Sequence, residues 1–144
     1  MGNNLSGTTY GEYAARRAYY YTSVCGDEAA IEDVETKLWH LRFTPRVFKK
    51  SKQQAKAKGV DISLTKDMLS HAFMDHYQFA VLVSGDGDYI PLVEEVKRLG
   101  KRVIVWFFGV DDGLNPRLRL AADEYYDLTQ LWINSWKTRV KLDR

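Results

Sequence analysis

Short apolar runs alternate with amphipathic segments along the chain, and this alternation predicts strands that alternate with helices. Residues 79–83 (Phe-Ala-Val-Leu-Val) form a continuous apolar run of strand length, which is typical of a parallel strand covered on both faces. The other predicted strands are rich in aromatic or β-branched residues. They are Ala18–Val24, Arg46–Phe48, Arg102–Phe108 and Glu124–Leu128.

The segments between these strands have the apolar spacing of helices. In residues 29–41 the large apolar side chains recur at intervals of three and four, and Thr44-Pro45 follows as a stop signal. Further helices are predicted over Ser63–His76 with Ser63 as N-cap, from Pro91 to the stop at Gly100, and over Arg117–Ala122. The order predicts a three-layer α/β fold, in which a mainly parallel sheet is flanked by helices and ligands bind beyond the carboxyl ends of the strands.

The amino-acid composition argues against several classes of protein. The 144 residues suit a single domain, and a formal charge of +2 is too small for a whole-surface polyanion trap. We expect a cytoplasmic protein without a membrane span, since no apolar stretch approaches the roughly 20 residues that spanning requires. One cysteine and three histidines argue against an internal disulfide or a Cys/His zinc site. The chemistry is therefore expected to depend on carboxylates, hydroxyls and amines.

An acidic loop follows the predicted strand at residues 79–83. It reads Ser84-Gly85-Asp86-Gly87-Asp88, with two carboxylates two residues apart and glycines that let the backbone turn sharply. Oxygen ligands of this kind suit Mg²⁺ or Mn²⁺. Asp and Asn also begin helices and form Asx turns, so helix capping is the competing interpretation.

Three further carboxylates and a group of lysines have two interpretations each. Asp61 is a candidate site residue or a helix cap. Asp67 lies beside the apolar stripe of the same helix and faces either a site or water. Asp123 precedes the last strand, where most carboxylates are capping or solvated. The lysines would contact phosphates without sequence specificity, or form a solvated loop. They are Lys49, Lys50, Lys52, Lys56 and Lys58.

Other site classes have less support. The acidic loop lacks the glutamate at the twelfth position of an EF-hand loop, and the histidines fall on predicted helices, away from the strand ends. Neither the P-loop motif nor G-x-G-x-x-G occurs in the sequence.

Several motifs together resemble the NYN domain family of PIN-like nucleases, which includes the LabA-type bacterial proteins. Their order and spacing carry the resemblance over about the last two thirds of the chain. They are Lys58-Gly59-Val60-Asp61, Asp67-Met68-Leu69, the run from Ala80 through Ser84-Gly85-Asp86-Gly87-Asp88 to Val93, Leu99-Gly100-Lys101-Arg102-Val103 and Ala122-Asp123-Glu124.

The resemblance implies a Rossmann-like PIN-type fold and a ribonuclease that cleaves RNA phosphodiester bonds with Mg²⁺ or Mn²⁺. It assigns metal ligation to Asp61, Asp86 and Asp88 and a supporting catalytic role to Asn4. Asp67, Ser84 and Asp123 become candidate residues around these ligands. The five lysines become candidates for binding the nucleic acid.

The start of the chain departs from the family pattern. NYN domains open with an apolar strand that ends in D-G-x-N-L, whereas here Met1-Gly2-Asn3-Asn4-Leu5 has Met1 at the aspartate position. The resemblance therefore predicts a single domain over residues 1–144 that is N-terminally truncated relative to the family. Loss of the first strand would expose the edges of its neighbours.

Two alternatives to a nuclease follow from this departure. One is a catalytically weakened or inactive module that binds RNA. The other is a protein-interaction module, in which exposed strand edges pair in a homodimer. The tail with Trp132 and Trp136 then either contributes to the interface or, as is commoner for two aromatic residues four apart on a helix, packs onto the domain.

Overall fold

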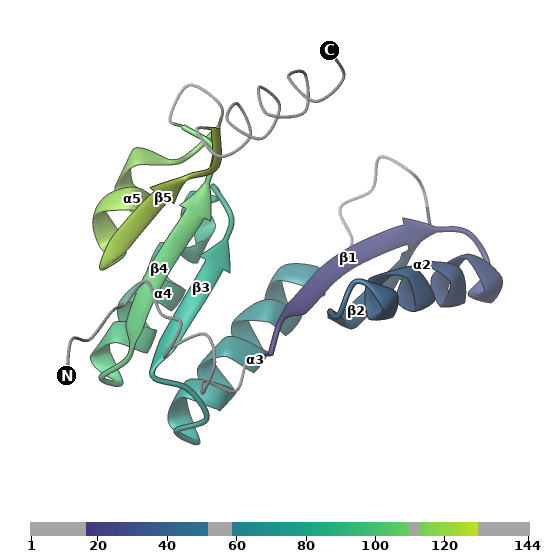
Figure 1. Cartoon of the computed structure of the whole chain (residues 1–144), viewed down its shortest axis with the longest axis horizontal. Helices are drawn as coiled ribbons and strands as arrows, with labels where there is room; N and C mark the ends of the chain where they lie inside the picture. Colours follow the sequence, from purple (N-terminus) through teal and green to yellow (C-terminus); the bar gives the residue numbers. More distant parts are fainter. Residues whose placement is uncertain (1–16, 52–58, 110–112, 130–144) are drawn as a thin grey trace, which may run out of the picture. The chain divides into compact units, whose positions relative to one another are not determined.

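The computed structural model describes residues 17–51, 59–109 and 113–129, and it divides the chain into two compact units. The first unit ends at Ser63 and the second begins at Leu64. Figure 1 shows the succession of helices and strands. The single domain over residues 1–144 stays a prediction.

The first unit contains a parallel β-α-β arrangement. Strand β1 (Tyr19–Cys25) pairs in parallel with β2 (Thr44–Lys50), and helix α2 (Glu28–His40) connects them. Asp27 begins α2, because its carboxylate accepts a hydrogen bond from the Ala30 N–H at 3.0 Å. The helix ends at His40, and the chain reverses at Arg42, which has a positive φ of 66°.

The second unit contains a three-stranded parallel sheet in the order β3-β4-β5. Its strands are β3 (Phe79–Val83), β4 (Arg102–Phe107) and β5 (Glu124–Asp127). Helix α4 (Ile90–Arg98) connects β3 to β4, and α5 (Pro116–Ala121) connects β4 to β5. Helix α3 (Val60–Phe73) begins in the first unit and continues in the second. Within the described residues, no helix is both long and apolar enough to cross a membrane.

The hydrophobic core of the second unit lies between the sheet and helices α3, α4 and α5. Leu82, Val103 and Val105 point from β3 and β4 into one cluster with Val93 of α4 and Leu118 of α5. Val93, Val103, Val105 and Leu118 are fully buried. These contacts hold the carboxyl ends of the strands in a fixed register.

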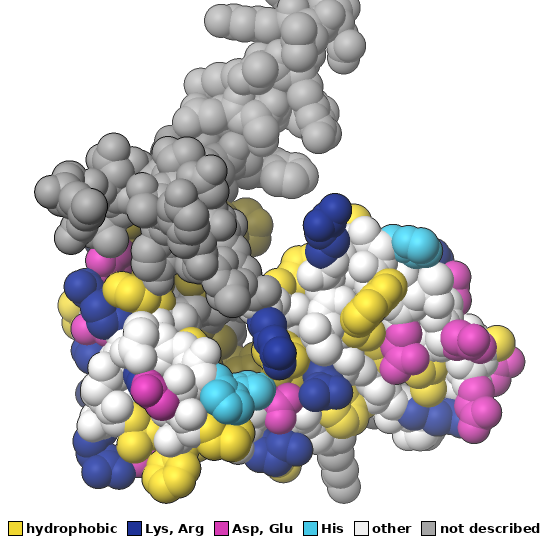
Figure 2. All heavy atoms as spheres, turned by 60° about the horizontal axis from the view of Figure 1, so that its bottom comes forward, with side chains coloured by type: hydrophobic (Ala, Val, Ile, Leu, Met, Phe, Trp, Pro, Cys, Tyr) yellow, Lys and Arg dark blue, Asp and Glu magenta, His cyan; other side chains and the backbone are white. Residues whose placement is uncertain are grey.

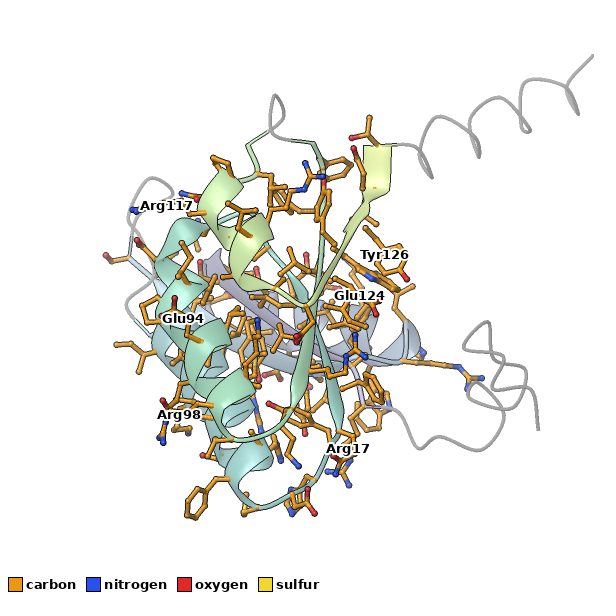
Figure 3. The ribbon with its side chains drawn as sticks, turned by 90° about the vertical axis from the view of Figure 1, so that its left-hand side faces the viewer. Arg17, Glu94, Arg98, Arg117, Glu124 and Tyr126 are labelled. Atoms are coloured by element: carbon orange, nitrogen blue, oxygen red, sulfur yellow. The ribbon has the colours of Figure 1, made fainter. Side chains whose placement is uncertain are left out.

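The opposite face of the same sheet is exposed, which differs from the expectation that the apolar run at residues 79–83 is covered on both faces. Phe79, Val81 and Val83 are 37%, 47% and 59% exposed, and Trp106 and Tyr126 are 41% and 52% exposed. In Figure 3, Tyr126 and Glu124 project from β5 on the side away from Glu94 and Arg98 of α4. The apolar run predicted the strand correctly, but burial depends on what packs against each face.

The predicted elements are confirmed with small shifts of their ends, and the three-layer prediction is confirmed as an α/β fold with parallel sheets flanked by helices. One capping prediction is wrong. Ser63 does not begin α3, since the helix begins at Val60 and the Ser63 N–H already donates to the Gly59 carbonyl at 2.8 Å. Gly59 has a φ of +111°, a conformation that glycine adopts readily, and so it allows the earlier start.

Candidate functional site at the carboxyl ends of β3 and β4

The loop that follows β3 is organised by its own side chains. The Ser84 hydroxyl oxygen accepts a hydrogen bond from the Asp86 N–H at 3.2 Å, and Asp86 Oδ1 accepts one from the Asp88 N–H at 2.9 Å. Asp86 thereby begins η1 (Gly87–Tyr89), a short 3₁₀ helix that leads into α4. The capping interpretation of Asp86 is therefore confirmed. It leaves the second carboxylate oxygen, Oδ2, outside this hydrogen bond.

A shallow cavity of about 630 Å³ opens beside this loop. Its wall combines the acidic loop with the end of β4 and residues that follow it, and it includes Ser84, Gly85, Asp86, Gly87, Phe107 and Asn115. The cavity thus lies beyond the carboxyl ends of parallel strands, where α/β sheets bind ligands. Asp86 is exposed and supplies negative charge to the cavity wall.

The two glycines of the loop have close neighbours. A Cβ atom on Gly85 would lie 2.3 Å from the Phe107 ring and 2.8 Å from the Gly113 carbonyl oxygen. A Cβ atom on Gly87 would lie 2.3 Å from Nδ2 of Asn115. Both glycines are therefore needed for the loop to pack against the segment that follows β4.

Asp88 differs from Asp86 in its surroundings. It is exposed, and no described residue donates a hydrogen bond to its carboxylate. The next residue, Tyr89, is buried in the core and anchors the loop. The two carboxylates therefore lie on a rigid support and retain oxygen atoms that a cation or a water molecule can reach.

Asp61 and Asp67 both lie on α3. Asp61 is exposed in the first turn of the helix, within the first unit. Asp67 belongs to the second unit, its side chain is 14% exposed, and its Oδ1 lies 3.7 Å from Nζ of Lys66. Both residues take part in further interactions in the structure.

Asp123 makes its contacts near the amino ends of β4 and β5. It precedes β5, its Oδ2 accepts a hydrogen bond from the Val103 N–H at 2.8 Å, and its Oδ1 lies 3.7 Å from Nζ of Lys97. Val103 is near the amino end of β4, whereas the acidic loop follows the carboxyl end of β3. Asp123 therefore links the amino end of β4 to the start of β5.

The candidates for nucleic-acid binding are only partly described. Lys49 and Lys50 end strand β2 in the first unit. Asn4, Lys52, Lys56 and Lys58, together with the tail at Trp132 and Trp136, lie outside the described residues. On the described surface visible in Figure 2, basic and acidic side chains are interspersed.

The donor set of the acidic loop fits a hard divalent cation. Mg²⁺ commonly binds through one or two carboxylates and completes its shell with water and substrate phosphate. Asp86 and Asp88 provide this number of carboxylates. Among residues 17–51, 59–109 and 113–129, no group of three Asp, Glu, His or Cys side chains is close enough to hold a metal ion.

Sequence reasoning missed Asn115. Its side-chain oxygen accepts hydrogen bonds from the N–H groups of Arg117 and Leu118 at 2.9 and 3.3 Å and so begins α5, while its amide group packs on Gly87. Its backbone N–H donates to the Gly85 carbonyl at 2.9 Å. The Asn115-Pro116 pair is a recognisable helix start, but only the folded chain shows that it supports the acidic loop.

Comparison with known proteins identifies the class to which this fold and acidic loop belong. The NYN domain family matches residues 3–129, which is most of the chain, and the chain belongs to this family. Membership implies a nuclease-like fold, and NYN and PIN-like nucleases generally use divalent metals.

One solved structure supports the fold. The chain is similar to a protein of unknown function from Vibrio parahaemolyticus, with 25% identity and a TM-score of 0.56. The similarity covers 74% of this chain and 65% of that one, so it spans just under two thirds of the length of the solved protein. No curated protein matches the sequence.

Proposed function

We propose that this protein is a metal-dependent ribonuclease that hydrolyses RNA phosphodiester bonds at the acidic loop. The observation that carries the proposal is the position of Asp86 and Asp88 on a rigid loop beside an open cavity at the carboxyl ends of the strands. The NYN family membership supports the same reaction class.

In this proposal Asp86 and Asp88 bind Mg²⁺ or Mn²⁺ together with Asp61, which the family motif contributes. The bound metal would acidify a water molecule and offset charge on the leaving oxygen. Ser84 fixes the Asp86 backbone through its hydroxyl group, and Gly85 and Gly87 allow the loop to pack on Phe107 and Asn115. Asn4 would hydrogen-bond the attacking water, and Asp67 is a further candidate residue around the metal ligands.

The RNA partner is proposed to bind by backbone contacts. Lys49, Lys50, Lys52, Lys56 and Lys58 would contact phosphates, which gives affinity without sequence specificity. We expect the affinity to fall as the salt concentration rises, because phosphate contacts release bound counterions.

The proposal predicts that Asp86→Asn abolishes cleavage while RNA binding is kept. Asparagine caps a helix about as well as aspartate, so the hydrogen bond to the Asp88 N–H is preserved and only the charge is lost. Cleavage of a generic single-stranded RNA with Mn²⁺ should fall by about 100-fold or more. EDTA should abolish the cleavage by the unsubstituted protein.

Glu94→Gln is the matched control, since it removes one negative charge from an exposed position on α4 of the same unit. It should cleave at the rate of the unsubstituted protein. Cleavage that persists in EDTA, or that survives Asp86→Asn, would contradict a metal nuclease at this loop.

The exposed sheet face favours a second candidate function, an interaction module that pairs with a second copy of this chain. Val81, Trp106 and Tyr126 are exposed on this face, and the rings of Trp106 and Tyr126 form an edge-to-face pair at 6.4 Å. Aromatic residues of this kind are enriched at the centres of protein interfaces. Among the described strands β3 pairs only with β4, and the edge of a strand can pair with a strand of another chain.

This candidate predicts a dimer that Val81→Lys dissociates. A lysine in the middle of the face would have to lose its hydration in the interface, which is unfavourable. Light scattering over a range of concentrations measures the mass, and Leu120→Lys, at an 82% exposed position on α5, is the control. A monomer at all concentrations would exclude this function.

A further inference from the structure

The turn between α3 and β3 brings two histidines together through its backbone. The His76 N–H donates to the His71 carbonyl at 2.9 Å, and the Asp75 N–H donates to the Ala72 carbonyl at 3.1 Å. Asp75 has a φ of +58°. These two hydrogen bonds and the left-handed residue define a Schellman motif. In this motif the side chain of the residue after the left-handed one contacts the side chain five positions before it, in the last turn of the helix. In this chain those side chains are His71 and His76.

The two imidazole rings meet through the same ring atom. Nδ1 of His71 lies 2.9 Å from Nδ1 of His76, and the ring centroids are 5.2 Å apart. A neutral imidazole has one donor and one acceptor nitrogen, so one Nδ1 carries a proton and donates a hydrogen bond to the other Nδ1. His76 is exposed and His71 is half-buried, which leaves the pair within reach of solvent.

The turn that holds His76 is fixed by its neighbours. Asp75 Oδ1 accepts hydrogen bonds from Nζ of Lys101 and, at 2.9 Å, from Nε2 of Gln78. The Lys101 hydrogen bond, followed by that of Gln78, lowers the pKa of Asp75. Since Lys101 is buried at the start of β4, this contact ties the turn to the sheet. The residue before His76 is therefore fixed to Lys101 and to Gln78.

We propose that His71 and His76 form a two-histidine binding site for a divalent transition-metal ion such as Zn²⁺. Zn²⁺ in proteins is usually tetrahedral with nitrogen ligands at about 2.0–2.1 Å, which places two such nitrogens roughly 3.3–3.4 Å apart. The Nδ1 atoms lie 2.9 Å apart, so small rotations of the two side chains would bring both nitrogens to one ion. On binding, the ring that carries its proton on Nδ1 would change to the tautomer protonated on Nε2, with water carrying the proton, and each Nδ1 would donate its lone pair to the ion.

This site differs from the acidic loop in position and in chemistry. The histidines precede β3, whereas Asp86 and Asp88 follow it, so the two sites lie at opposite ends of the strand. Imidazole nitrogens prefer Zn²⁺, Ni²⁺ and Cu²⁺, and carboxylates prefer Mg²⁺ and Mn²⁺. The proposal therefore stands independently of the nuclease function.

The test is calorimetric titration of the full chain with Zn²⁺ alone. His71→Gln and His76→Gln should each lower the affinity by about tenfold or more. The chain offers a matched control in its third histidine, because His40 lies on α2 in the first unit, and His40→Gln should bind Zn²⁺ like the unsubstituted protein.

Two further measurements make the test decisive. Thermal unfolding of each variant without metal checks that the fold is retained, and Zn²⁺ should raise the melting temperature of the unsubstituted protein more than that of His76→Gln. The affinity should decrease as the pH falls, because protons compete for the imidazole nitrogens. Equal affinities for the unsubstituted protein and both folded histidine variants would overturn the proposal, and so would an equal loss in His40→Gln.

Discussion

Leu118→Ala is expected to lower the free energy of unfolding by about 2–5 kcal/mol. Leu118 is fully buried in the core of the second unit, where it packs in one cluster with Val93 and Val105. Alanine would remove apolar surface from that cluster and leave a cavity that α5 can fill only by moving. Because small domains are stable by about 5–15 kcal/mol, this is a large share of the total.

Urea denaturation followed by circular dichroism measures the change, and α5 provides its own control. Leu120 lies two residues further on and is 82% exposed, so Leu120→Ala should change the stability by less than about 0.5 kcal/mol. An equal effect of the two substitutions would show that α5 does not pack in the orientation described here.

Gly85→Ala is expected to destabilise the second unit by about 1–3 kcal/mol and to disrupt the acidic loop. The added methyl group would overlap the Phe107 ring and the Gly113 carbonyl oxygen, at 2.3 and 2.8 Å. The ring would have to move away from Gly85, or the backbone after β4 would have to shift. Either movement displaces the wall of the cavity beside Asp86.

The same denaturation experiment tests this substitution, with Gly109→Ala as the comparison. Gly109 follows β4, and a Cβ atom there would meet its nearest neighbour, Oδ2 of Asp127, at 3.4 Å, which is close to an ordinary contact. The free energy of unfolding should change much less in Gly109→Ala than in Gly85→Ala. A fully stable Gly85→Ala would mean that the loop does not pack on Phe107.

The dependence of the loop on Gly85 and Asn115 connects stability with the proposed function. The carboxylates of Asp86 and Asp88 are exposed, yet the backbone that holds them is fixed by the contacts of the loop with Phe107, Asn115 and the core residue Tyr89. Variants that weaken these contacts should lose activity together with stability. Asp86→Asn should lose activity without a loss of stability, because asparagine still caps η1.

Much of the second unit can be predicted from the sequence. The apolar run at residues 79–83 specified β3, because strand length and continuous apolar character are local properties. Pro91 and Gly100 marked the beginning and end of α4 for the same reason. The acidic loop could also be placed, since the residues after a parallel strand lie at its carboxyl end.

Only the tertiary structure decided which polar residues meet. Asp86 and Asp123 are both aspartates next to strands, but Asp86 borders a cavity and Asp123 binds the backbone of Val103. His71 and His76 come together because Asp75 adopts a left-handed conformation and Lys101, 26 residues away, holds it. Sequence patterns report the periodicity of one element, whereas these contacts depend on how separate elements pack. The chain by itself therefore determined its helices, strands and acidic loop, and packing determined the surroundings of each charged group.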